Sequence, residues 1–115
     1  MATALTVSTV ARAGIVLSTL GTSADGAGNN FLNTGNEFLY IKNASVGTIT
    51  VTLVNQLTID GAAVTAKTVA ILTLTEVLIG PFPTEIYNDA NGKMNVTWSG
   101  VTSTTVLACK LLPKV

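Results

Sequence analysis

The residues that could do chemistry in this chain are few, and the most common catalytic side chain is missing. The sequence has 115 residues with no histidine and a single cysteine, Cys109. Without histidine the chain cannot build a Ser-His-Asp triad or a Cys-His pair, and it lacks the usual zinc ligand. Cys109 would have no histidine to activate it as a nucleophile. We therefore expect Cys109 to be a small buried hydrophobic residue of the last strand, in a protein without a disulfide framework.

Carboxylates could still act in pairs, as in glycosidases, where two of them face each other across the sugar. The acidic residues of this chain are instead spread over expected turns and strand ends, which favours solvated surface positions. They are Asp25, Glu37, Asp60, Glu76, Glu85 and Asp89. We therefore expect that the protein is not an enzyme and that it uses no metal or other cofactor.

Four short patterns resemble functional motifs but lack residues or a context that those motifs require. Residues 21–26 have the glycine spacing of a phosphate-binding loop, but Ala27-Gly28 stands where Lys-Ser/Thr is needed. Residues 89–92 begin like a calcium loop without its later acidic ligand. The Asn-x-Ser/Thr sequons at Asn43 and Asn95 lie in a chain without a recognisable secretory signal. We interpret all four patterns as ordinary turns and strands.

Two aromatic residues, Trp98 and Tyr87, could form a platform on which a sugar stacks. Trp98 shares an expected strand face with Met94 and Val96, so a place in the core is the stronger interpretation. The six basic residues are dispersed and equal the acidic residues in number, which leaves no basic patch for nucleic acid. No stretch reaches the roughly 20 apolar residues of a membrane-spanning helix. We expect neither nucleic acid nor a membrane as a partner.

Uncharged side chains dominate the composition. Hydrophobic residues make up 48% of the chain and charged residues only 10%, and the formal net charge is zero. A typical soluble domain is about a quarter charged. A neutral surface with few charges is poorly soluble by itself, and large exposed apolar patches mark interaction sites. We therefore expect part of this surface to be covered in an assembly; the alternative is a small neutral domain of a larger soluble protein.

The pattern of side chains predicts that these residues are carried on short strands. Phe38–Ile41 is an uninterrupted apolar run, and residues 49–53 alternate between aliphatic residues and threonine. Turn-forming residues at 43–47 separate them, which predicts a hairpin at the centre of the fold. Residues 93–99 alternate in the same way, and Gly80–Pro83 marks the exit of a strand.

Further strands are expected between turns that contain glycine, asparagine and proline. They cover residues 56–60, 64–74, 76–79 and 104–112. The most turn-rich stretch, residues 21–30, is predicted to be a surface loop. Eight or so short strands with regular turns predict an all-β fold. We expect one β-sandwich or jelly-roll-like domain over residues 1–115.

The N-terminal residues 1–13 are expected to form an extended arm on this domain. Leu5 and Val7 alternate with hydroxyl side chains, as in an edge strand, and Gly14 follows as a hinge. A terminal extended segment of this kind can lie along a neighbouring subunit. We therefore predict that the arm makes contacts with another protein chain.

Three stretches of the chain, in this order, resemble a known family. They are MATALTV running into VARAG at residues 10–14, then FLYIKN at 38–43 followed by ITVT at 49–52, then IGPFP at 79–83 followed by Tyr87-Asn88. This order resembles the small head decoration, or cement, proteins encoded beside the major capsid protein in tailed bacteriophages. The resemblance spans nearly the whole chain. It implies a β-sandwich or jelly roll that clamps neighbouring capsid subunits on the outer surface of the virion, with no catalytic residues.

The resemblance implies as partners the major capsid protein and further copies of this chain, as a dimer or trimer, made in the host cytoplasm. We expect the capsid contacts to come from the N-terminal arm and from the loop at residues 21–30. The candidate contact residues are Thr3, Leu5, Val7, Val10, Arg12, Asp25, Asn29 and Asn30. The alternatives are another virion component, such as a head-tail connector or tail protein, and a carbohydrate-binding β-sandwich module.

Overall fold

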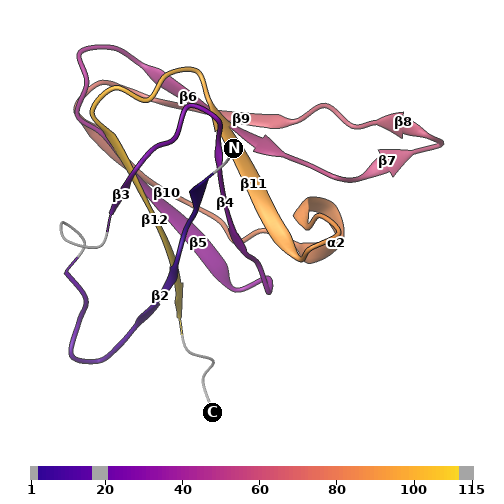
Figure 1. The fold of residues 1–115 in the computed structure, drawn as a ribbon, viewed down its shortest axis with the longest axis horizontal. Helices are drawn as coiled ribbons and strands as arrows, with labels where there is room; N and C mark the ends of the chain where they lie inside the picture. The colour runs from indigo at the N-terminus through magenta and orange to yellow at the C-terminus, as the bar shows by residue number, and fades with distance from the viewer. Residues whose placement is uncertain (1–2, 17–20, 112–115) are drawn as a thin grey trace.

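The structure, a computed structural model, describes residues 3–16 and 21–111, with only the backbone of Leu111. Its strands form two main sheets and a small two-stranded ribbon (Figure 1). The first sheet has the order β1 (Thr3–Ala4), β4 (Asn29–Leu32), β11 (Lys93–Trp98), β6 (Ile49–Val54) and β9 (Lys67–Ile71). The second has the order β10 (Thr75–Ile79), β5 (Glu37–Asn43), β12 (Thr104–Leu111) and β2 (Val7–Val10), with β3 (Thr22–Ser23) also on β12. The ribbon pairs β7 (Thr58–Ile59) with β8 (Ala62–Ala63), and α2 (Thr84–Tyr87) is a single helical turn.

The hydrophobic core lies between the two main sheets, so the predicted all-β sandwich is confirmed. From the second sheet, Leu39 and Ile41 are fully buried, and from the first sheet Val51 and Met94 are fully buried in the same cluster. The alternation expected in residues 49–53 is present in β6, because Ile49, Val51 and Leu53 are buried while the threonines are half-buried. Strand periodicity therefore identified the inward faces of β6 and β11 correctly, whereas the uninterrupted apolar run at residues 38–41 concealed that β5 also alternates between buried and half-buried residues.

The predicted central hairpin is wrong, because β5 and β6 do not pair with each other. β5 lies between β10 and β12 in the second sheet, whereas β6 lies between β11 and β9 in the first. Residues 44–48 instead carry the chain from one sheet to the other. A turn between two strands of one sheet and a connection between two sheets use the same turn-forming residues, so the sequence pattern could not separate them.

The predicted strand 64–74 is shorter in the structure. β9 covers only Lys67–Ile71, and residues 72–74 turn into the second sheet, where β10 begins at Thr75. Leu74 has a φ of 57° in this turn. β10 ends at Ile79 and is followed by Gly80, whose φ is 142° and where an added Cβ would lie 2.9 Å from Cβ of Phe38. Only glycine fits this exit from the strand.

The N-terminal segment is extended, as expected, but both of its strands belong to the molecule's own sheets. β1 pairs in parallel with β4 of the first sheet, and β2 pairs in parallel with β12 of the second. Leu5, between the two strands, is 7% exposed and belongs to the core cluster. The structure therefore corrects the expectation of a free arm at residues 1–13, of which it describes residues 3–13: this segment ties the two sheets together.

The predicted loop at residues 21–30 is also shorter than expected. Residues 22–23 form β3 on the margin of β12, and β4 already begins at Asn29. Ala24 between these strands is buried. Within the predicted loop only Gly21 and residues 24–28 lie outside the strands, so the segment is largely part of the sandwich.

Candidate functional site

Four of the candidate contact residues come together where β1 meets β4: Thr3, Asp25, Asn29 and Asn30. The carboxylate of Asp25 accepts hydrogen bonds from the hydroxyl of Thr3 and, at 2.9 Å, from the backbone N–H of Ala27. These two bonds, with that of Thr3 the larger cause, lower the pKa of Asp25 below its usual value. A charged Asp25 therefore holds the start of the chain against the segment between β3 and β4.

Asn29 is an internal link of this cluster and not a surface contact. It is 0% exposed, and its Oδ1 accepts hydrogen bonds from the Trp98 indole N–H at 2.8 Å and from the Asp25 backbone N–H at 3.1 Å. Its Nδ2 donates to the carbonyl of Thr3 at 3.2 Å. Asn29 is therefore too buried to contact a partner. The indole N–H of Trp98 has its hydrogen-bond acceptor within the protein.

The other candidate contact residues are distributed between the core and the surface. Leu5 is in the core and is also removed from the contact surface, while Val7 and Val10 are half-buried along β2. Arg12 is exposed in the turn after β2, and Asn30 is half-buried on the outer side of the first sheet. Of the described candidates, only Thr3 and Arg12 are exposed, and the hydroxyl of Thr3 is already bonded to Asp25.

A buried asparagine, Asn43 at the end of β5, holds two connections between the sheets. It is 0% exposed, and its Nδ2 donates to the carbonyls of Gly47 and Ile71, each at 2.9 Å. Its Oδ1 accepts from the backbone N–H of Ser45 at 2.9 Å and from the Ser45 hydroxyl at 2.6 Å. The hydroxyl of Thr73 also donates to the carbonyl of Ser45. Residues 44–48 and residues 72–74 are thus joined into one hydrogen-bonded unit, which we call the apolar turns.

The apolar turns present large hydrophobic side chains to solvent. Val46 is 102% exposed, Leu74 is 77% exposed and Leu72 is 60% exposed. Hydrophobic side chains on turns that are already fixed by hydrogen bonds lose little conformational freedom when they bind a partner. The strand and turn patterns of the sequence did not predict this surface, although leucine at two positions of one short turn was a visible signal.

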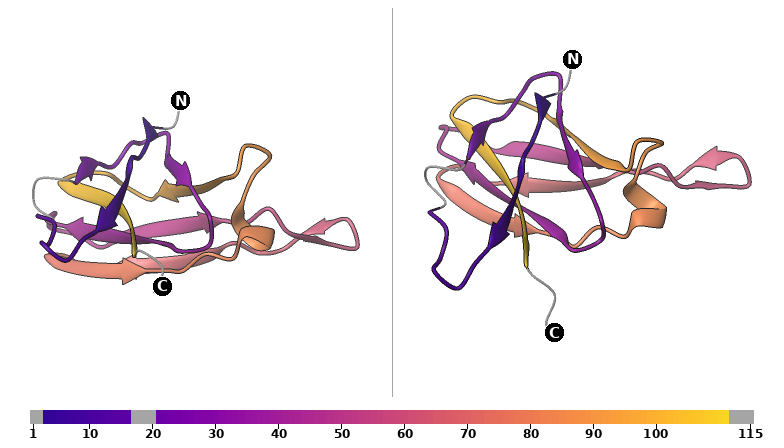
Figure 2. Two further views of the ribbon diagram at one scale, coloured as in Figure 1. Left: turned by 90° about the horizontal axis from the view of Figure 1, so that it is seen from below. Right: turned by 60° about the horizontal axis from the view of Figure 1, so that its bottom comes forward.

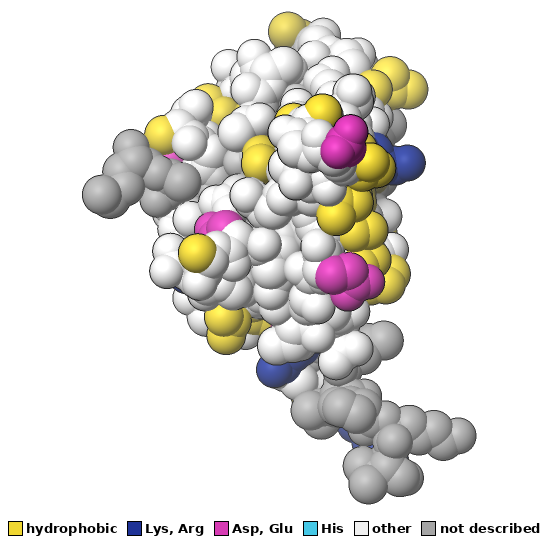
Figure 3. Space-filling view, turned by 90° about the vertical axis from the view of Figure 1, so that its right-hand side faces the viewer, with side chains coloured by type: hydrophobic (Ala, Val, Ile, Leu, Met, Phe, Trp, Pro, Cys, Tyr) yellow, Lys and Arg dark blue, Asp and Glu magenta, His cyan; other side chains and the backbone are white. Residues whose placement is uncertain are grey.

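A second apolar projection is the hairpin formed by β6 and β9, which continues past the sandwich as residues 55–66 (Figures 1 and 2). Asp60 and Gly61 at its tip both have positive φ, 54° and 78°, which is the geometry of a tight hairpin turn. Leu57 is 37% exposed and Ile59 is 64% exposed. Figure 3, which looks onto the tip, shows hydrophobic side chains gathered along one margin of this face. The sequence predicted a strand here, but not that it leaves the sandwich.

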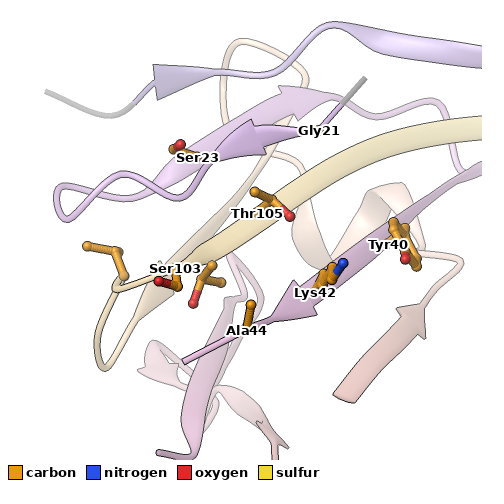
Figure 4. Close-up of a pocket in the computed structure, with 9 residues that line it drawn as sticks. Gly21, Ser23, Tyr40, Lys42, Ala44, Ser103 and Thr105 are labelled. Carbon is orange, nitrogen blue, oxygen red and sulfur yellow. The ribbon is translucent and has the colours of Figure 1, made fainter. Parts of the chain in front are cut away.

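A hollow of about 550 Å³ lies over the ends of β5, β12 and β3 (Figure 4). Thr105 lies between Ser23 and Lys42 in the strand register, and Glu76 on β10 is the next neighbour of Lys42. Tyr40, Ser103 and Thr104 also line the hollow, and the described residues around it present several hydroxyl groups, one ammonium group and no carboxylate. Such a lining can hydrogen-bond an oxygen-rich group.

The remaining side chains that could do chemistry are the carboxylates and one thiol. Within residues 3–16 and 21–111 no three or more acidic or thiol side chains gather where they could hold a metal ion. Cys109 is 1% exposed, as expected, and burial raises the pKa of its thiol, so the sulfur stays protonated. In the same part of the chain, no helix has the length and apolar character to cross a bilayer. Comparisons with protein-family models, curated proteins and solved structures give no match.

Proposed function

We propose that the protein is a virion structural protein, a decoration or cement protein that binds the outside of a tailed-bacteriophage head and stabilises contacts between major capsid proteins. The family resemblance of three stretches supports the proposal. The observation that carries it is the set of exposed hydrophobic side chains on fixed turns and on a projecting hairpin of a nearly uncharged sandwich. Its partners are the major capsid protein and further copies of this chain.

Stable protein–protein interfaces bury a large surface that carries little charge at its centre. The centre of such an interface is depleted in charge, and a stable interface buries on the order of 1,200–2,000 Å² in total. Each apolar Å² removed from water contributes about 25 cal/mol. Many copies on one closed shell each add their binding free energy to the assembled state only, which makes the shell more resistant to rupture.

The geometry favours the apolar turns and the hairpin 55–66 as the surfaces that touch the capsid. Both are exposed, and the apolar turns are fixed by the buried Asn43. The N-terminal segment now has another role, because β1 and β2 complete the two sheets. We therefore assign the capsid contact to the turns and the hairpin rather than to the arm.

The test replaces the exposed side chains of the apolar turns. A Val46→Ser/Leu72→Ser/Leu74→Ser variant should keep its melting temperature and lose at least about tenfold in affinity for purified phage heads that lack the protein. Leu32→Ser is the matched control, because Leu32 is 57% exposed on β4 of the first sheet. The control should bind within about twofold of the wild type. A triple variant that decorates heads as the wild type does would contradict the proposal.

Electron microscopy of the labelled heads separates the alternatives. Label over the whole shell supports a cement protein, whereas label at a single vertex indicates a head-tail connector. The carbohydrate-binding alternative has no support in the placement of its two rings. Trp98 donates its N–H to Asn29, and Tyr87 packs edge-on against Phe82 with centroids 5.7 Å apart. Both rings lie against the core cluster.

A further inference from the structure

β10 is an edge strand with one unpaired side. It forms an antiparallel ladder with β5 over all five of its residues, from Thr75 to Ile79. Among the described residues no strand pairs with its other side. Alternate backbone N–H and C=O groups of an edge strand point away from its single neighbour. Figure 2 shows β10 at the margin of the molecule. These groups form a template for another extended chain.

The other edges of the two main sheets are less suited to such pairing. Proteins commonly protect edge strands by making them very short or by placing lysine or proline in them. β1 has only two residues, and β9 begins with the exposed Lys67. β2 has four residues, none of them well exposed. β10 has neither lysine nor proline, and its Leu78 is 66% exposed.

We propose that β10 pairs in antiparallel orientation with β10 of a second copy of this chain, about a two-fold axis. The pairing would join the second sheets of both copies into one continuous sheet. An antiparallel strand is complementary to itself, so one edge supplies both halves of the contact. This inference refines the self-association in the proposed function, and it does not depend on binding to a capsid.

The side chains select one register for this pairing. Residues that face each other across two strands must lie on the same side of the sheet. A two-fold axis at Val77 pairs all five residues and places Glu76 opposite Leu78 of the second copy. An axis at Glu76 would set two carboxylates directly opposite each other, which is destabilising, and would pair fewer residues of β10. In the favoured register Glu76 keeps Lys42 as its neighbour on β5. The negative charge of Glu76 is therefore balanced by a positive charge within the same copy.

Engineered disulfides test the register directly. Opposed residues of antiparallel strands have Cα atoms about 4.5–5.5 Å apart, within the range that a disulfide bridges. A Glu76→Cys/Leu78→Cys double variant should form a covalent dimer on mild oxidation of the purified protein. Each single variant should not, because its new thiol faces a residue without sulfur. The wild-type chain is the background control, since its only thiol, on Cys109, is buried.

Light scattering on the purified protein gives a second readout. The wild type should be a dimer at high concentration, and Leu78→Glu should weaken dimerisation about tenfold, because each new carboxylate would lie directly opposite Glu76 of the other copy. Leu32→Glu, on β4 of the first sheet, should leave the dimer unchanged. A double cysteine variant that stays monomeric on oxidation would overturn the proposal. Covalent dimers of Leu78→Cys alone would overturn the register. In either case the binding of the protein to phage heads is measured separately and remains a distinct result.

Discussion

At the scale of single residues, buried amides and one buried carboxylate fix the connections between strands. Besides Asn43, Asn33 donates from Nδ2 to the carbonyl of Phe82 at 2.9 Å and to Oδ1 of Asn88 at 2.7 Å. Oε1 of the buried Glu37 accepts from the backbone N–H of Thr34 at 2.7 Å. A buried polar group stabilises a fold only when its hydrogen bonds are made. Replacing any of these residues would therefore leave buried backbone or side-chain groups without a hydrogen-bond partner.

Replacement of Asn43 tests this role. Asn43→Ala should lower the free energy of unfolding by about 2 to 3 kcal/mol, because backbone carbonyls of both apolar turns lose their buried donor. Urea unfolding measures the change. Asn36→Ala is the matched control, since Asn36 is exposed in a turn, and it should change stability by less than about 0.5 kcal/mol. Equal stability of the two variants would show that the apolar turns are not held by Asn43.

At the scale of elements, the N-terminal segment decides how the sandwich is closed. β1 extends the first sheet, β2 extends the second, and Leu5 enters the core between them. The hairpin of β6 and β9 has the opposite role, because its end leaves the sandwich and exposes Ile59. In the sequence, the N-terminal segment and the end of the hairpin both have strand patterns with hydroxyl side chains. The N-terminal segment nevertheless pairs within the two sheets, whereas the end of the hairpin projects from them.

A substitution at Leu5 distinguishes a built-in segment from a free arm. Leu5→Ala should lower the free energy of unfolding by about 2 to 4 kcal/mol, because it leaves a cavity in the core. Arg12→Ala, in the exposed turn that follows, should change it by less than about 0.5 kcal/mol. Thermal or urea unfolding of both variants gives the comparison. If Leu5→Ala is as stable as the wild type, the N-terminal segment is not docked between the sheets.

At the scale of the whole molecule, the near absence of charge sets how the protein meets its partners. The net charge is zero and one residue in ten is charged, while hydrophobic side chains are exposed on the apolar turns and the hairpin. Long-range attraction between charges contributes little to such an association, so burial of apolar surface must supply most of its free energy.

The salt dependence of binding follows from this balance. Affinity for phage heads should change by less than about threefold between 0.05 and 0.5 M sodium chloride, because there is little charge attraction to screen. Sodium sulfate should strengthen the binding, since it favours apolar burial. Co-sedimentation with heads at each salt concentration measures both effects. A loss of affinity by more than tenfold in sodium chloride would indicate an electrostatic contact and contradict this account.

The sequence by itself determined the all-β class, the inward faces of β6 and β11 and the buried state of Cys109. These properties follow from side-chain periodicity and composition, which are local. The tertiary structure alone decided that β5 and β6 lie in different sheets, that Asn29 is buried under Trp98, and that residues 55–66 project. Each of these depends on which distant strands pair, and many pairings satisfy the same alternation of apolar and polar residues. Only the packing of both sheets around one core selects among them.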